Sequence, residues 1–381
     1  MTRAFPAHVR VAGADDEKIV WGADQACWGA YVRALAQAAP RAALANAAFE
    51  LRVLQLRDRA FPLVAPISGA CWLTSLATTY GQAARDEVAR EVHGMQAAVF
   101  MALSHLAEGV LRLTKADHVV FANHLLFSTS LYGDWAGEDI EPALAALRAA
   151  FPKRAIVWRS LNLDEHTALA ALMTRHGGRR LLSRIVWRLA DPARDWAPRR
   201  DARDDRQLLE THNLRVESAR EVADDDLLPV LAFYNDIYLA KYSRTNPAYQ
   251  PALLRAAIES GVLTLRLIRN EAGALEAFTA EHVYQGALVN PMLGYDRTLP
   301  QARGLYRIAM AVSAERAIAE GLSVNYSAGA GAFKRNRGAR PTLEFSMIFD
   351  AHLPFWRRLS YRCLAWALEA MAPMLERIAV K

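Results

Sequence analysis

A proline inside an apolar strand pattern marks the first place where this sequence could do chemistry. Residues 286–296 read GALVNPMLGYD, and Pro291 has no N–H group to donate to a ladder, so we expect a bulge that splays this strand from its neighbour. The following QARGLY, residues 301–306, begins a predicted helix whose free N–H groups suit a pyrophosphate, and Arg303 and Arg307 would add charge-assisted contacts. An ordinary strand, turn and helix with exposed arginines explains the pattern equally well.

A glycine-rich run with basic residues is a second candidate site. Residues 328–338 contain glycines followed by Lys334 and Arg335, and Arg337 and Arg340 extend the positive charge. Flexible glycines beside a cationic pair suit close approach to a phosphate or a carboxylate. A basic surface loop is the alternative interpretation.

A polar and aromatic loop in the first half is a third candidate. It contains His124, Ser128, Thr129, Ser130 and Tyr132. The loop could bind an acceptor head group, although a turn whose hydroxyls are satisfied locally is the more ordinary interpretation. No Ser-His-Asp order and no metal-ligand spacing is convincing, so the sequence predicts no metal site.

Length and composition indicate the kind of fold that must position these residues. The chain has 381 residues, 53% of them hydrophobic and 23% charged, which suggests two globular domains. No apolar run reaches the roughly 18 residues of a membrane span, and the first residues lack the layout of a secretory signal. The three cysteines fit no disulfide or zinc pattern. We therefore expect a reduced, cytoplasmic protein, and a net charge of +6 does not favour nucleic-acid binding.

Hydrophobic periodicity predicts alternating helices and strands in both halves. In the first half we expect strands at 51–57, 60–67, 117–127, 154–162 and 179–190, and helices at 25–49, 82–113 with a break near His93, 137–150, and a helix capped by Asp164 that ends at 174. In the second half we expect strands at 213–221, 262–271, 274–284, 286–296, 322–327 and 342–353, and helices at 224–242, 247–260, 302–320 and 354–379. The charged residues 191–206 read as the connection between domains. The fold class is therefore α/β, with domains at 1–190 and 191–381.

Several of these segments resemble a known family. QARGLY resembles the Q/R-x-x-G-x-G/A acyl-CoA motif of GNAT N-acyltransferases, with Tyr306 where that motif has Gly or Ala. The segments KYSRTNP (241–247), GYD (294–296), NYSAGAGAFKRNRGARPTLEF (325–345) and HLP (352–354) resemble the GNAT-related group of Fem-like peptidoglycan aminoacyl transferases and cellulose-locus (CelD-like) acyltransferases. The resemblance covers residues 224–354. It implies two tandem GNAT-like domains, each a mixed, largely antiparallel sheet flanked by helices, the first of them degenerate and structural or acceptor-binding.

The resemblance also implies roles for individual residues. Acyl transfer to an amine needs a base, and Glu281 is preferred over His282, which points to the opposite side of the same strand. Tyr326 is expected as the acid, and Lys334 completes the catalytic set. The expected donor-binding residues are Gln301, Arg303, Gly304, Leu305, Tyr306 and Arg307, and the expected substrate-binding residues are Lys241, Tyr242, Ser243, Asn246, Asn290 and Arg335.

The expected reaction moves an acyl group, with room for a long chain, from acyl-CoA or an acyl carrier protein to a primary amine of a lipid or secondary metabolite. No permanently bound cofactor and no nucleic-acid partner is expected. The alternatives are a Fem-like transferase that uses aminoacyl-tRNA and a non-catalytic GNAT-fold binding protein. The C-terminal helix, with Trp356, Trp366 and several arginines, can lie on the inner membrane surface, but packing on the sheet is favoured because Pro373 and Glu369 interrupt its apolar face.

Overall fold

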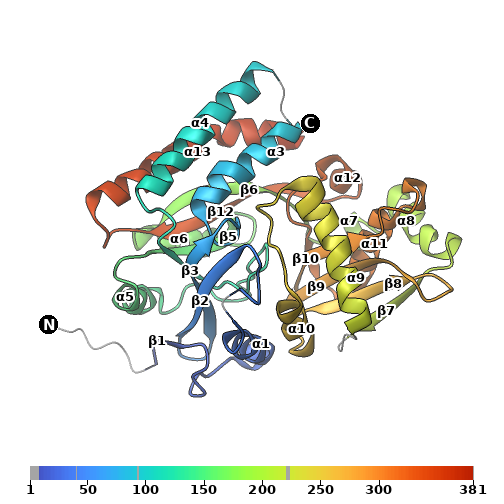
Figure 1. Ribbon diagram of the computed structural model, residues 1–381, viewed down its shortest axis with the longest axis horizontal. Helices are drawn as coiled ribbons and strands as arrows, with labels where there is room; N and C mark the ends of the chain where they lie inside the picture. The colour runs from blue at the N-terminus through green and yellow to red at the C-terminus, as the bar shows by residue number, and fades with distance from the viewer. Residues whose placement is uncertain (1–7, 40, 92–93, 220–223, 381) are drawn as a thin grey trace.

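The computed structural model describes residues 8–39, 41–91, 94–219 and 224–380, and their strands form one continuous sheet (Figure 1). The sheet has twelve strands in the order β1-β2-β3-β4-β5-β12-β6-β11-β10-β9-β8-β7. Neighbouring strands are antiparallel except in the pairs β4–β5 and β10–β11. This mixed, mostly antiparallel sheet flanked by helices confirms the predicted α/β class.

The first half supplies strands β1 to β6. Their bounds are β1 (Arg10–Gly13), β2 (Ala47–Gln55), β3 (Ala60–Gly69), β4 (Val119–Ala122), β5 (Ala155–Asn162) and β6 (Arg179–Leu189). The helices between them are α1 (Ala26–Ala36), α2 (Leu76–Thr78), α3 (Ala84–Glu91), α4 (Met95–Leu113), α5 (Ile140–Ala150) and α6 (Thr167–Arg175), with the π-helical turn η2 (Thr79–Ala83) between α2 and α3.

The second half begins with two helices, α7 (Pro192–Asp195) and α8 (Arg200–Thr211). Its strands are β7 (Arg215–Ala219), β8 (Thr264–Arg269), β9 (Leu275–Tyr284), β10 (Ala287–Tyr295), β11 (Ser323–Asn325) and β12 (Arg340–Phe349). Its other helices are α9 (Asp224–Asn235), which continues into the π-helical η3 (Asp236–Tyr242), α10 (Pro251–Glu259), α11 (Leu305–Glu320), α12 (Gly331–Asn336) and α13 (Phe355–Val380).

The strand order shows that the two halves repeat one pattern. Read from either edge, four antiparallel strands lead to a fifth that is parallel to the fourth, and a helix, α5 or α11, connects the fourth strand to the fifth. The last strand of each half crosses over: β12 lies between β5 and β6, and β6 pairs with β11. Strands of both halves therefore form the centre of the sheet. The predicted domain boundary between residues 190 and 191 remains a prediction.

Most element predictions agree with the structure, but the following three do not. The helix expected over 25–49 ends at Ala36, because residues 47–55 pair with β3 instead. His166, and not Asp164, precedes the first turn of α6. Residues 191–206 were expected to be a connection but contain α7 and the start of α8. The expected break near His93 falls on a residue outside the described parts of the chain.

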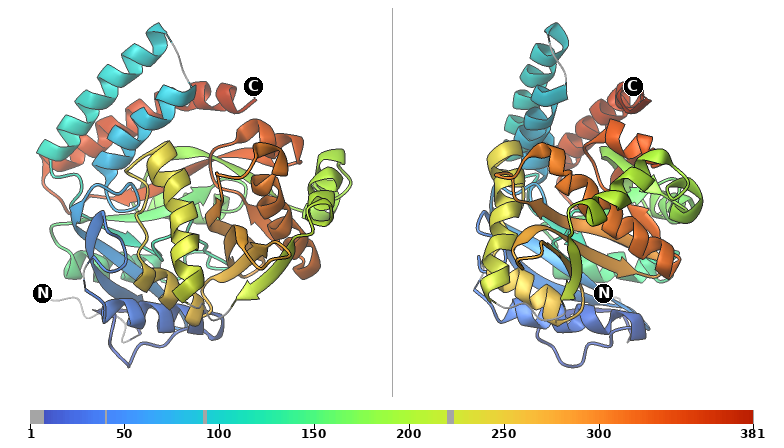
Figure 2. Two further views of the ribbon diagram at one scale, coloured as in Figure 1. Left: turned by 45° about the vertical axis from the view of Figure 1, so that its right-hand side comes forward. Right: turned by 90° about the vertical axis from the view of Figure 1, so that its right-hand side faces the viewer.

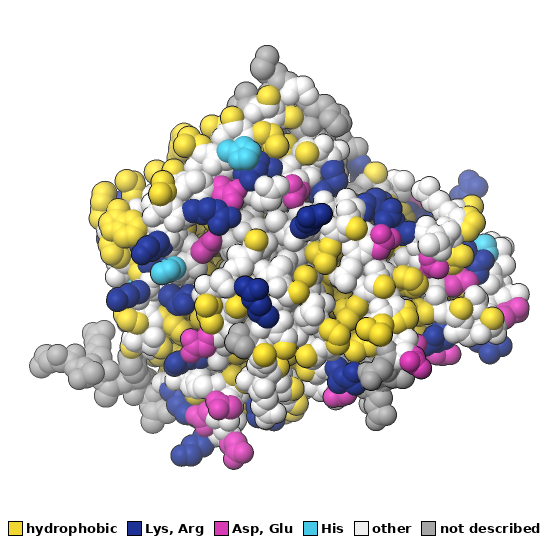
Figure 3. All heavy atoms as spheres, in the orientation of Figure 1, with side chains coloured by type: hydrophobic (Ala, Val, Ile, Leu, Met, Phe, Trp, Pro, Cys, Tyr) yellow, Lys and Arg dark blue, Asp and Glu magenta, His cyan; other side chains and the backbone are white. Residues whose placement is uncertain are grey.

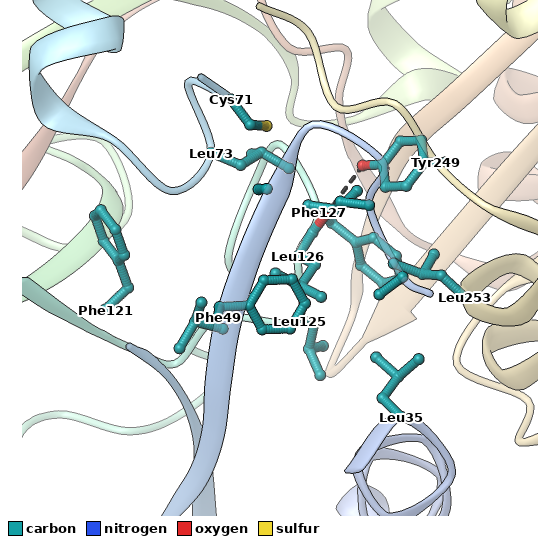
Figure 4. Packing of buried hydrophobic residues seen from close by; sticks show 14 of the residues in the cluster. Leu35, Phe49, Cys71, Leu73, Phe121, Leu125, Leu126, Phe127, Tyr249 and Leu253 are labelled. Carbon is teal, nitrogen blue, oxygen red and sulfur yellow. Dashed lines mark hydrogen bonds between the residues drawn. The ribbon is translucent and has the colours of Figure 1, made fainter. Parts of the chain in front are cut away.

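The first-half loop after β4 packs between the halves. Leu125, Leu126 and Phe127 are buried against α1 and α10. The Tyr249 hydroxyl donates to the Leu126 carbonyl oxygen (Figure 4), and the Tyr31 hydroxyl donates to the Leu125 carbonyl oxygen. The loop backbone thereby binds a tyrosine from each half. Among the described residues no helix is both long and apolar enough to cross a membrane.

Candidate active site

The strands β10 and β11 separate where the sequence predicts a bulge. They pair only over Ala287–Val289, and the register between β10 and β9 shifts between Val289 and Met292. Pro291 lies in this gap, where no N–H group is required of it. Beyond Val289 the edge of β10 that faces β11 therefore has no strand partner.

A polar network lies beneath the bulge, between the sheet and α11. The Asn290 amide nitrogen donates to Thr279 Oγ1 at 2.8 Å and to Ser313 Oγ at 2.9 Å. Ser313 in turn donates to Glu281 Oε1 at 2.7 Å. The Asn290 Oδ1 atom is buried and has no hydrogen-bond partner among the described residues, so the bulge contains an unsatisfied acceptor. The sequence analysis did not single out Ser313, whose only signal is a polar residue in the apolar pattern of α11.

Glu281 is oriented differently from the expected base. It is buried on β9, and its second carboxylate oxygen accepts a hydrogen bond from Arg316 at 2.8 Å, with Arg266 Nε at 3.5 Å. Both oxygens thus have partners within the protein, and the expected role of Glu281 as the base remains a prediction. His282 does point to the other face, where its Nδ1 lies 2.9 Å from the Val262 carbonyl oxygen.

Tyr326 and Lys334 meet at the end of β11. Burial, with the Glu281 carboxylate nearby, raises the pKa of the Tyr326 hydroxyl, which stays protonated. The Lys334 ammonium donates to the carbonyl oxygens of Tyr326, Ser327 and Ala328, at 2.7, 3.2 and 2.8 Å. Burial lowers its pKa to about 7. The three hydrogen bonds hold the turn after β11, and the expected place of Lys334 in the catalytic set remains a prediction.

The expected phosphate-binding arginines are paired with carboxylates of the chain. Glu276 accepts two hydrogen bonds from Arg303, one of them at 2.7 Å. The buried Asp205 of α8 accepts from Arg307 at 2.6 Å and from two nitrogens of Arg337. These pairs offset the positive charge that the expected pyrophosphate contacts would use, and those contacts remain a prediction.

The start of α11 is covered rather than open. Gly304 has a positive φ of 67°, and a Cβ at this position would lie 2.7 Å from Leu208 of α8. Leu305 is buried in the core and Gln301 is exposed. The Tyr306 ring packs against Tyr295 and Phe333, with centroids 6.4 and 5.0 Å apart. Tyr306, which is larger than the Gly or Ala of the resembled motif, thus forms an aromatic cluster beside the separated strands β10 and β11.

The expected substrate-binding residues around 241–246 lock the two halves together. Ser243 donates to Asp86, and Asn246 accepts a hydrogen bond from Trp72 Nε1 at 2.9 Å. The Tyr242 ring lies under the Arg90 guanidinium, while Lys241 is exposed beside it. Ser243 and Asn246 therefore contact first-half residues, and their expected role in substrate binding remains a prediction. Arg335 lies on α12, and Arg340 lies at the start of β12.

The described residues contain no group of three or more His, Cys, Asp or Glu side chains placed to hold a metal ion.

No family model and no curated protein matches the chain. Among solved structures, the chain is similar to L-PGS from Bacillus licheniformis, with a TM-score of 0.43 and 12% identity over 56% of this chain and 72% of that one. It is also similar to FemX, with a TM-score of 0.45 and 9% identity over 60% and 78% of the two chains. A tandem GNAT protein from the clavulanic acid biosynthesis pathway overlaps 89% of this chain and 97% of its own, with a TM-score of 0.40 and 11% identity.

Proposed function

We propose that this chain is an N-acyltransferase that moves an acyl group from a thioester to a primary amine. The observation that carries the proposal is the unpartnered Asn290 acceptor in the bulge. It lies beside the part of the β10 edge that does not pair with β11. An extended arm with amide groups, such as the pantetheine shared by CoA and acyl carrier proteins, can hydrogen-bond along such an edge. Two of the sequence motifs that resemble the GNAT group involve these strands: GYD (294–296) lies at the end of β10, and the motif 325–345 begins at the end of β11.

In the proposed reaction the amine nitrogen attacks the thioester carbonyl carbon, and the carbon–sulfur bond then breaks. Asn290 Oδ1 accepts a hydrogen bond from the attacking amine, while Ser313 and Glu281 fix the orientation of the Asn290 amide. The Tyr326 hydroxyl gives its proton to the leaving thiolate. The proton that the amine releases restores the Tyr326 hydroxyl, so the products are an amide and a free thiol.

The donor contacts are expected along the arm and the acyl chain rather than at a nucleotide end. Arg303 and Arg307 are both paired with carboxylates, and Tyr306 stands where the resembled motif has a small residue. A donor carried by an acyl carrier protein fits this arrangement as well as acyl-CoA does. The acceptor class we favour is the amine of a lipid or a secondary metabolite.

The test is an assay of thiol release by the full chain. Acyl-CoA and acyl carrier protein donors of two to sixteen carbons, and an aminoacyl-tRNA, are paired with a panel of amines, and products are identified by mass spectrometry. We expect Asn290→Ala and Tyr326→Phe each to lower kcat by about 100-fold. Tyr284→Phe, a buried tyrosine packed on Trp28 on the other side of the sheet, is the matched control. Absence of turnover and of binding with every donor would sink the proposal.

A non-catalytic binding protein is the second candidate. The carboxylates that neutralise Arg303, Arg307 and Arg337 favour it, because they occupy groups that a phosphorylated donor would use. Donor binding without turnover, unchanged by Tyr326→Phe, would support this candidate over the enzyme.

A further inference from the structure

The outward face of α4 is apolar over most of its length. Leu103, Leu106, Val110 and Leu113 are 60%, 66%, 41% and 84% exposed. Their spacing of three or four residues places them on one stripe of the helix. Soluble proteins rarely leave a continuous apolar stripe of this kind uncovered, so the stripe indicates an interaction surface.

The first turns of α13 continue this apolar surface. Phe355, Trp356 and Leu359 are 67%, 48% and 44% exposed, and Trp366 further along is 76% exposed. The segment after α4 holds α13 in place, because Arg357 donates to the carbonyl oxygens of Lys115 and His118 at 3.0 Å. The two helices form a ridge on one end of the molecule (Figure 2), and hydrophobic side chains gather along its edge (Figure 3).

The other face of α13 packs on the sheet, as the sequence analysis favoured. Tyr361 is buried and donates to the Ala116 carbonyl oxygen at 2.9 Å, and Leu364 and Ala365 join the core. The helix therefore has a buried face that fixes it and an exposed face that the fold does not use.

Basic residues surround the apolar ridge. Arg112, Lys115 and Arg362 are exposed beside it, and Arg358 is half-buried. An open hollow of about 410 Å³ along α13 is lined by Arg179, Arg180, Arg362 and Trp366, among others. Among the described side chains of α4 and α13 the acids are Glu108 and Glu369. Glu108 pairs with Arg85 and with Arg112 of its own helix, and Glu369 pairs with Arg180. The charge around the ridge is thus complementary to an anionic surface.

We propose that the α4–α13 ridge docks this protein on the surface of a membrane that contains anionic lipid. Leucine and aromatic side chains would enter the boundary between headgroups and acyl chains, with tryptophans at headgroup level. The arginines and Lys115 would contact lipid phosphates. This inference goes beyond the proposed reaction and does not depend on it.

The test is flotation of the full chain with vesicles of phosphatidylcholine alone and of phosphatidylcholine with 30% phosphatidylglycerol. We expect binding to the anionic vesicles that weakens as salt is raised. The double variant Leu106→Asp and Leu113→Asp should lower the vesicle partition coefficient by at least about tenfold, since each change removes apolar area and adds repulsion. The matched control is Leu228→Asp on α9, which is 64% exposed but outside the ridge.

Three outcomes would overturn the proposal. They are no binding to either vesicle, binding unaffected by the double variant, and a dimer in light scattering that the double variant converts to a monomer without any vesicle binding. Thermal unfolding of the variants confirms that they fold. Thiol release with a soluble amine and no vesicles should be unchanged in the double variant, which keeps this test separate from that of the proposed reaction.

Discussion

Arg184 of β6 donates from Nε to Oε1 of Glu344 on β12 at 2.9 Å, and the two residues are directly opposite each other in the antiparallel ladder. The pair joins the last strand of the first half to the last strand of the second half. Glu344 is 2% exposed, and its other carboxylate oxygen has no partner. A buried ion pair therefore lies where the two halves exchange strands.

Glu344→Gln should destabilise the fold strongly. It leaves the largely buried Arg184 without its counter-ion, and breaking one side of a buried pair costs about 3–5 kcal/mol. Urea unfolding followed by circular dichroism measures the change. Glu217→Gln is the control, because this glutamate is 56% exposed in its pair with Arg269 and its loss should cost less than about 1 kcal/mol. Equal losses in the two variants would contradict the argument.

The exchange of β6 and β12 predicts that the chain unfolds as one unit. Residues 1–190 alone would lack β12, which lies between β5 and β6, and residues 191–381 alone would lack β6, which pairs with both β11 and β12. We expect tryptophan fluorescence and far-ultraviolet circular dichroism to report the same transition midpoint. Expressed separately, the two fragments should be insoluble. Two resolved transitions, or a folded fragment, would show independent domains.

A substitution at Gly304 tests how closely α8 packs on the start of α11. Alanine there meets both an unfavourable backbone conformation, at φ 67°, and the Leu208 side chain 2.7 Å from the new Cβ. Gly321→Ala is the matched control, since its φ is 66° and nothing lies within 4 Å. We expect Gly321→Ala to cost about 1 kcal/mol and Gly304→Ala about 1–3 kcal/mol more, from overpacking. Chemical unfolding curves of the two variants measure the difference.

The part of the site that depends on local sequence was predictable, and the part that depends on distant partners was not. Pro291 identifies the bulge because the missing N–H group is a property of one residue. Nothing near Arg307 or Arg337 in the sequence reveals that Asp205 binds both, since that aspartate belongs to a charged segment that resembles a linker. Likewise, β12 lies beside β5 through a crossing of strands that hydrophobic periodicity does not encode.

His282 should make the stability of the protein depend on pH. Burial lowers the pKa of this imidazole to about 4, from an ordinary value of 6.5, because the charged form would lose its hydration between Trp28 and Phe127. The folded state then binds fewer protons than the unfolded state between these values. The contribution of neutral His282 to the free energy of unfolding is therefore complete above pH 6.5 and is lost as the pH falls towards 4. The total loss is about 3 kcal/mol.

The variant His282→Asn isolates this contribution. The neutral imidazole donates from Nδ1 to the Val262 carbonyl oxygen, and an asparagine amide can make the same hydrogen bond without titrating. The variant will be less stable at pH 7 because its side chain is smaller, so the informative quantity is the slope of the free energy of unfolding between pH 6.5 and 4. We expect a shallower slope than in the unmodified protein, with a remainder from His124, whose pKa burial also lowers. Equal slopes in the variant and the unmodified protein would show that protonation of His282 does not destabilise the fold. That result would contradict the effect expected from the burial of His282 between the halves.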